Sequence, residues 1–79
     1  MFVTVKLFAS LRKYLPDRAE NSACRIELSE SSTVEQLAAA LNIPEKAPKL
    51  MLVNGRHSPK SRLLEEDDVV SMFPPIGGG

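Results

Sequence analysis

The residues that follow Phe73 contribute almost nothing to a packed core, and they limit the folded domain to what precedes them. Residues 73–79 read FPPIGGG. Pro74 and Pro75 fix φ and lack backbone donors, so a sheet ladder cannot continue through them and the departing chain stays extended. We therefore expect a folded domain over residues 1–73 and an extended tail over residues 74–79.

The glycines that follow Ile76 have no side chains and contribute almost nothing to a core. From Gly77 to Gly79 the straightened tip reaches at most about 11 Å, enough to enter a narrow slot in another protein. The alternative is a frayed terminus or an added linker, since both are often rich in glycine. The prolines before the glycines favour the first interpretation.

The composition is that of one small soluble globular domain. The 79 residues are 43% hydrophobic and 25% charged, and ten basic residues balance ten acidic ones. No bulk field therefore attracts nucleic acid or an anionic membrane. The apolar stretches are too short to span a membrane and the start has no signal-peptide profile, so we expect a cytoplasmic protein. A single cysteine, Cys24, excludes an internal disulfide, and its apolar strand favours an inert core thiol.

Alternating apolar and polar residues predict strands over residues 2–7, 24–28, 50–53 and 69–73, and Asn54-Gly55 predicts a tight hairpin with a brief partner strand at Arg56 and His57. A short helix over residues 9–15 should end at Pro16. Leu63 and Leu64 should anchor a turn before the acidic run of residues 65–68, which we interpret as solvated. These elements predict an α+β fold with a mixed sheet of four to five strands and one main helix across it.

The main helix follows Ser32-Thr33-Val34-Glu35, which we interpret as a capping box between the serine oxygen and the glutamate. Its apolar stripe has the i, i+3, i+4, i+7 spacing of a helix that lies on a sheet, and consists of Val34, Leu37, Ala38 and Leu41. Asn42 should end this helix.

Alternation in the last strand predicts which residues a partner can reach. Val70 and Met72 should face the helix, while Ser71 and Phe73 face outward. Phe8 shares the outward parity of Thr4 and Lys6, although a turn there could swing it inward. If the first and last strands are parallel neighbours, Phe8 and Phe73 lie at the same end and form a docking patch with Pro74, Pro75 and Ile76. The alternative is that both rings are core residues. His57 is expected to be a plain surface residue at the rim.

The chain resembles the MoaD/ThiS family of ubiquitin-like sulfur carriers, which have a β-grasp fold. The resemblance rests on VTVKLFA at residues 3–9, Thr33-Val34 at the helix start, Val53-Asn54-Gly55 at the hairpin, and residues 69–79. The ending Phe-Pro-Pro, one apolar residue and glycines is most similar to the small subunit of molybdopterin synthase. Gly77 departs from the pattern, because a terminal glycine pair would suffice.

The resemblance implies a carrier that is not itself an enzyme. An E1-like enzyme, using its own ATP and Mg, would adenylate the carboxylate of Gly79, which becomes a thiocarboxylate that donates sulfur, while Gly77 and Gly78 give access. We see no phosphate-binding loop or metal-ligand cluster in the sequence, so we expect no cofactor on this chain. The large subunit of molybdopterin synthase would be the second partner. Alternatives are sulfur transfer to a thiamine precursor or tRNA, a modifier conjugated to lysines, and a reversible interaction module.

Overall fold

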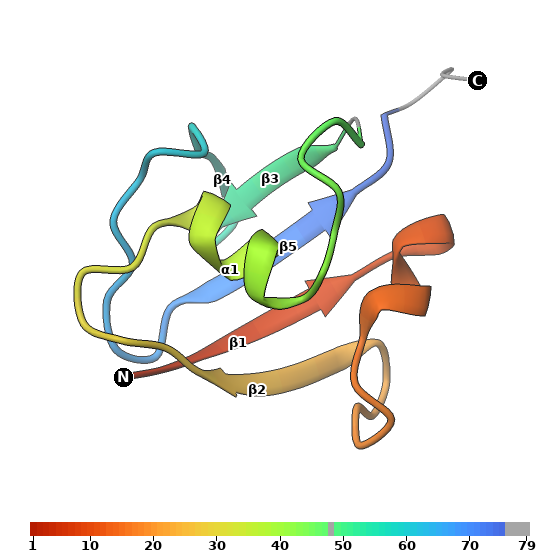
Figure 1. The fold of residues 1–79 in the computed structure, drawn as a ribbon, viewed down its shortest axis with the longest axis horizontal. Coiled ribbons are helices and arrows are strands. Elements are labelled where there is room, and N and C mark those ends of the chain that lie inside the picture. The colour runs from red at the N-terminus through yellow and green to blue at the C-terminus, as the bar shows by residue number, and fades with distance from the viewer. Residues whose placement is uncertain (48, 76–79) are drawn as a thin grey trace.

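A five-stranded mixed sheet carries one α-helix on one of its faces (Figure 1). The computed structural model describes residues 1–47 and 49–75. The elements in chain order are β1 (Phe2–Leu7), the 3₁₀ helix η1 (Ala9–Tyr14), β2 (Ala23–Glu27), α1 (Val34–Ala40), β3 (Leu50–Val53), β4 (Arg56–His57) and β5 (Val69–Phe73). The expected α+β class and the five predicted strands are thus confirmed.

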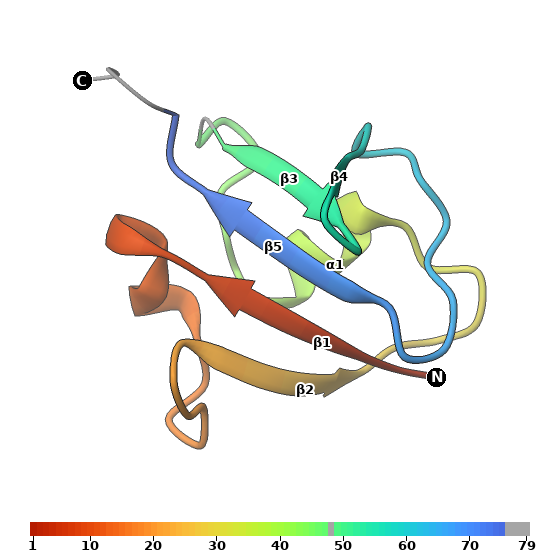
Figure 2. The same cartoon turned by 180° about the vertical axis from the view of Figure 1, so that it is seen from behind.

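The strands lie in the order β2-β1-β5-β3-β4, so the first and last strands of the chain are neighbours at the centre (Figure 2). β1 runs parallel to β5, with Thr4 opposite Val69 and Leu7 opposite Met72. It runs antiparallel to β2, and β3 runs antiparallel to both β4 and β5. The parallel pair places the carboxyl ends of β1 and β5 at the same end of the sheet.

The core lies between α1 and the sheet. The inward residues of β1 and β5 are almost fully buried, and they meet the predicted stripe of the helix, of which Val34 and Leu37 are completely buried. The members of this core that the sequence predicted are Val3, Val5, Leu7, Cys24, Val34, Leu37, Ala38, Leu41, Val70 and Met72. Burial of the Cys24 thiol agrees with its prediction as a core residue.

The capping box is real but starts one residue later than predicted. Thr33, not Ser32, is the N-cap: its Oγ1 accepts the Gln36 backbone N–H at 3.2 Å, and the Gln36 Oε1 accepts the Thr33 N–H at 2.7 Å. The Ser32 hydroxyl instead donates to the Ser29 carbonyl at 2.7 Å. Both registers place a hydroxyl three residues before a Glu or Gln, so the sequence pattern alone could not separate them.

Left-handed residues end the helix and close the hairpin as predicted. Asn42 follows the C-cap with φ of 63°, and Asn54 and Gly55 have φ of 52° and 84°. Asparagine tolerates this region better than most residues, and glycine has no Cβ to oppose it. The hairpin therefore turns within two residues and sends Arg56 and His57 back along β3.

The predicted short helix is a 3₁₀ helix that ends at Tyr14. Hydrogen bonds from the Leu11 N–H to the Phe8 carbonyl and from the Leu15 N–H to the Arg12 carbonyl span three residues each. Leu11 is the buried anchor of this helix. A short connection between a strand and Pro16 leaves little room for α-helical turns, and 3₁₀ geometry suits such short segments.

Two expectations about residues 63–68 are wrong. Leu63 is 59% exposed and does not anchor this segment. Leu64, which is 4% exposed, anchors it alone. Asp68 is not a solvated member of the acidic run: it is 7% exposed, and its carboxylate accepts the Asn54 Nδ2 amide at 2.9 Å and the Glu65 N–H at 2.8 Å. Asn54 Oδ1 accepts the Val69 N–H at 2.9 Å. Buried carboxylates require such partners, and Asp68 finds them in its own turn and in the neighbouring hairpin.

We predict that Thr33→Ala lowers the free energy of unfolding by about 1 kcal/mol, because the variant removes the hydroxyl that accepts the Gln36 N–H. Thr33→Ser keeps this oxygen and should retain most of the stability. Urea denaturation monitored by circular dichroism measures both values. Equal losses in the two variants would contradict the assigned cap.

We predict that Asp68→Ala lowers the free energy of unfolding by about 1–3 kcal/mol, because it leaves the Asn54 amide and the Glu65 N–H without their acceptor. Glu65→Ala is the matched control: its side chain is exposed, so the change should stay within about 0.5 kcal/mol. Thermal and urea unfolding of both variants test this. A similar stability for the two variants would show that the buried network contributes nothing.

Candidate functional site

Phe8 and Phe73 form a stacked pair at the end of the sheet from which the tail departs. Their ring centroids are 4.5 Å apart and the ring planes differ by 5°. Parallel pairing of β1 and β5 brings the rings together, and the Phe8 N–H donates to the Met72 carbonyl at 3.2 Å to extend that pairing by one residue. Both rings are half-buried and neither belongs to the core cluster. The predicted outward placement at one common end is therefore confirmed.

An apolar hollow of about 460 Å³ surrounds this pair, and we call it the tail-root hollow. Leu50 lies opposite Phe73 and Leu52 lies opposite His57 in the sheet register. The lining residues are Phe8, Ala9, Leu50, Leu52, His57, Phe73, Pro74 and Pro75. Helix α1 lies on the other face, so this apolar end of the outer face is open to a partner (Figure 2).

Sequence reasoning missed Leu50 and Leu52. The signal was present, because alternation in the strand at residues 50–53 sends every second side chain outward, and Val53 is the one that is fully buried. The sequence pattern alone could not predict that β3 pairs with β5. That pairing brings two leucines beside the phenylalanines.

The root of the tail runs between two hollows. Pro74 and Pro75 line the tail-root hollow and also a second one, of about 290 Å³, whose other walls include Leu11 and Tyr14 of η1. Ile76, Gly77, Gly78 and Gly79, the remaining predicted tail residues, lie outside the described part of the chain. Their extension and their role stay predictions.

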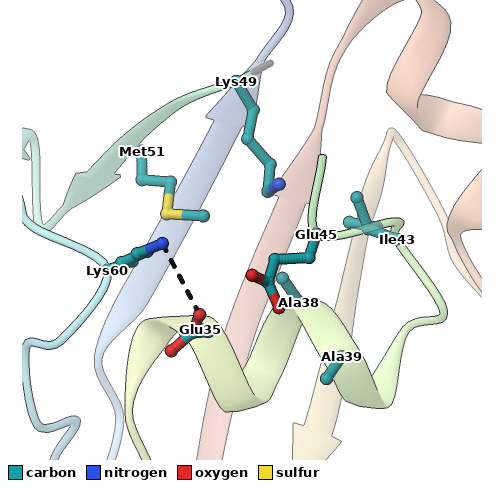
Figure 3. A pocket seen from close by; sticks show the side chains of 8 residues that line it. All are labelled: Glu35, Ala38, Ala39, Ile43, Glu45, Lys49, Met51 and Lys60. Carbon is teal, nitrogen blue, oxygen red and sulfur yellow. Dashed lines mark ion pairs between the residues drawn. The ribbon is translucent and has the colours of Figure 1, made fainter. Parts of the chain in front are cut away.

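The other candidates have separate positions. His57 is exposed, as expected, and lines the tail-root hollow, where it is the one titratable side chain among the lining residues. Lys60 forms an ion pair with Glu35 at 3.7 Å beside a different hollow, of about 110 Å³, between α1 and β3 (Figure 3).

Within residues 1–47 and 49–75, no three His, Cys, Asp or Glu residues are grouped to hold a metal ion. In the same part of the chain, neither helix has the length and apolar character that crossing a membrane requires. Apart from His57, the side chains that line the tail-root hollow are apolar.

Comparison with known proteins gives a family match over nearly the whole chain. The ThiS family model matches residues 5–79. A search of the curated proteins gives no match.

Solved structures share the fold. The putative molybdopterin converting factor subunit 1 of Pyrococcus furiosus is 29% identical, with 95% of this chain and 98% of that chain covered and a TM-score of 0.73. Small archaeal modifier protein 1 of Haloferax volcanii is 20% identical, with 95% and 98% covered and a TM-score of 0.75. The complex of subunits 1 and 2 of the molybdopterin-converting factor of Helicobacter pylori includes a match at 21% identity, with 100% of both chains covered and a TM-score of 0.65.

These likenesses confirm the predicted β-grasp fold, and the family match confirms the resemblance seen in the sequence. The chain therefore belongs to the ThiS family of small ubiquitin-like carrier proteins.

Proposed function

We propose that this protein is a sulfur carrier whose terminal glycine, Gly79, is adenylated by an E1-like enzyme and converted to a thiocarboxylate that donates sulfur. The observation that supports this most is the stacked Phe8–Phe73 pair, which lies in an open apolar hollow at the root of the tail. An enzyme that binds this surface would hold the body at the point from which the tail leaves it. Family membership through residue 79 gives independent support.

Activation of the Gly79 carboxylate requires the activating enzyme. A carboxylate is a poor electrophile because its charge is delocalised, so a good leaving group must be attached first. A carboxylate oxygen of Gly79 attacks the α-phosphorus of ATP and displaces pyrophosphate. Hydrosulfide from the sulfur donor then attacks the acyl carbon, a C–S bond forms, the bond between the acyl carbon and the AMP oxygen breaks, and the thiocarboxylate remains as AMP leaves. The activating enzyme supplies ATP and Mg, while this chain supplies the carboxylate and the docking surface formed by Phe8, Phe73, Pro74 and Pro75.

For the acceptor, we propose a precursor of molybdopterin, with the large subunit of molybdopterin synthase as the second partner. Support comes from the Pyrococcus furiosus relative, which is named as a molybdopterin converting factor subunit, and from the Helicobacter pylori structure, which is a complex of subunits 1 and 2 of that factor. Transfer to a thiamine precursor or to tRNA would use the same activated carrier.

A second candidate function is that of a protein modifier joined to lysine amines. The structural similarity to small archaeal modifier protein 1 favours keeping this function as an alternative. Both functions share the activation step and differ only in the acceptor. Immunoblots of cell extract separate them, because conjugation gives products of higher mass and sulfur transfer to a small molecule does not.

We predict that incubation with the cognate activating enzyme, ATP and a sulfur donor raises the intact mass by the difference between one sulfur and one oxygen atom. Gly78→Val should abolish this change without unfolding the protein, because a side chain obstructs a narrow slot. Mass spectrometry measures both. A wild-type terminus that never gains sulfur would refute the proposed function.

We predict that Phe73→Ala raises the KM for the carrier in the adenylation reaction at least tenfold, since a buried aromatic anchor contributes about 2 kcal/mol or more to binding. Phe2→Ala is the matched control, because Phe2 is a partly exposed aromatic of the same sheet that does not line the tail-root hollow. Pyrophosphate exchange measures KM, and circular dichroism confirms folding. Equal KM values for the two variants would exclude the phenylalanine pair as the docking point.

A further inference from the structure

Two further hollows adjoin the tail-root hollow in sequence around the free edge of the sheet. It shares Leu50 and His57 with a neighbouring hollow of about 340 Å³. That hollow in turn shares Lys49, Met51 and Lys60 with the hollow between α1 and β3 (Figure 3). A path lined by side chains therefore runs from the root of the tail, past the edge of β3, to the surface of α1. We call this path the edge trough.

The trough exists because β4 is short. β4 pairs with Leu52 and Val53, and the Ser58 N–H donates to the Met51 carbonyl at 3.1 Å; among the residues that the structure describes, no strand pairs with Leu50 on that side. Strand alternation sends Leu50 to the outer face and Met51 to the helix face. Leu50 is 37% exposed, and Met51 packs against the edge of the core. Apolar surface is thus present on both faces, and the more polar middle hollow lies between them.

The inner end of the trough is narrow. Ala38 and Ala39 of α1 form one wall with small side chains, and Met51 lies opposite them (Figure 3). The hollow there measures about 110 Å³. Because a cavity of about 150 Å³ holds one benzene molecule, this space suits one aliphatic side chain and excludes a nucleotide.

The middle of the trough is lined by Lys49, Lys60 and Glu45, with His57 beside them. The Lys49 Nζ donates to the carbonyls of Ala47 at 2.9 Å and Pro44 at 3.4 Å. Within the described residues, no carboxylate lies within 4.0 Å of this ammonium, whereas the Lys60 Nζ lies 3.7 Å from Glu35 Oε2. Lys49 thus carries a charge that an acidic group of a partner could pair with.

We propose that the edge trough is a second docking surface, occupied by an acidic segment of the activating enzyme. This inference rests on the proposed function, since the enzyme that positions the tail must also hold the body. The segment places one aliphatic side chain between Ala39 and Met51 and a carboxylate against Lys49. The trough begins in the tail-root hollow, so one partner can cover both.

Two variants and two matched controls test the trough. Ala39→Leu adds a larger side chain at its inner end, whereas Ala40→Leu makes the same change at the next position, which is exposed like Ala39 but does not line the trough. Lys49→Glu reverses the charge in the trough, whereas Lys46→Glu reverses an exposed charge in the same loop outside it. All four chains are compared with wild type for KM and kcat in pyrophosphate exchange with the cognate activating enzyme, and circular dichroism confirms their folding.

We expect Ala39→Leu and Lys49→Glu each to raise KM about tenfold, which corresponds to about 1.4 kcal/mol, with kcat nearly unchanged. Both controls should stay within about twofold of wild type. If wild type is adenylated and the trough variants match their controls, the trough inference is overturned while the proposed function stands. If wild type is not adenylated at all, the proposed function fails and the inference fails with it.

Discussion

Parallel pairing of β1 with β5 is the interaction on which the rest of the structure depends. It joins the first and last strands of the fold at the centre of the sheet, with Leu7 opposite Met72. Parallel strands point the same way, so the residues that follow them emerge at one end. For this reason Phe8 and Phe73 stack there, at the root of the tail. The same pairing that builds the core therefore also builds the candidate docking surface.

The two faces of the sheet differ in what covers them. One face is sealed by α1, whose apolar stripe covers the inward residues of β1 and β5. No helix of the described residues covers the other face (Figure 2), and its apolar residues line the tail-root hollow. At the opposite end of β5, Asp68 and Asn54 tie the start of the strand to the hairpin. We expect this network to hold the strand in register, because it satisfies polar groups that burial would otherwise penalise.

A carrier of this kind divides the work with its partners. In our proposal, a small body without its own nucleotide site provides recognition, and the tail provides the carboxylate that is activated. The docking surface and the edge trough lie on the body, so contacts there can be varied without touching the reacting group. Partner recognition and reactivity are then separable, and the two can be measured apart as KM and kcat.

Local patterns in the sequence determined the strands, the helix and the hairpin, because alternation, the helical stripe and Asn54-Gly55 act over a few residues. Parity also placed Val70 and Met72 inward and Phe73 outward. Only the tertiary structure decided the rest. The N-cap fell on Thr33, whose Oγ1 accepts the Gln36 N–H, while the Ser32 hydroxyl donates to the Ser29 carbonyl. Asp68 became buried, since the fold brought Asn54 to it. Leu50 and Leu52 line the tail-root hollow because β3 lies beside β5, and strand order depends on contacts between residues far apart in the chain.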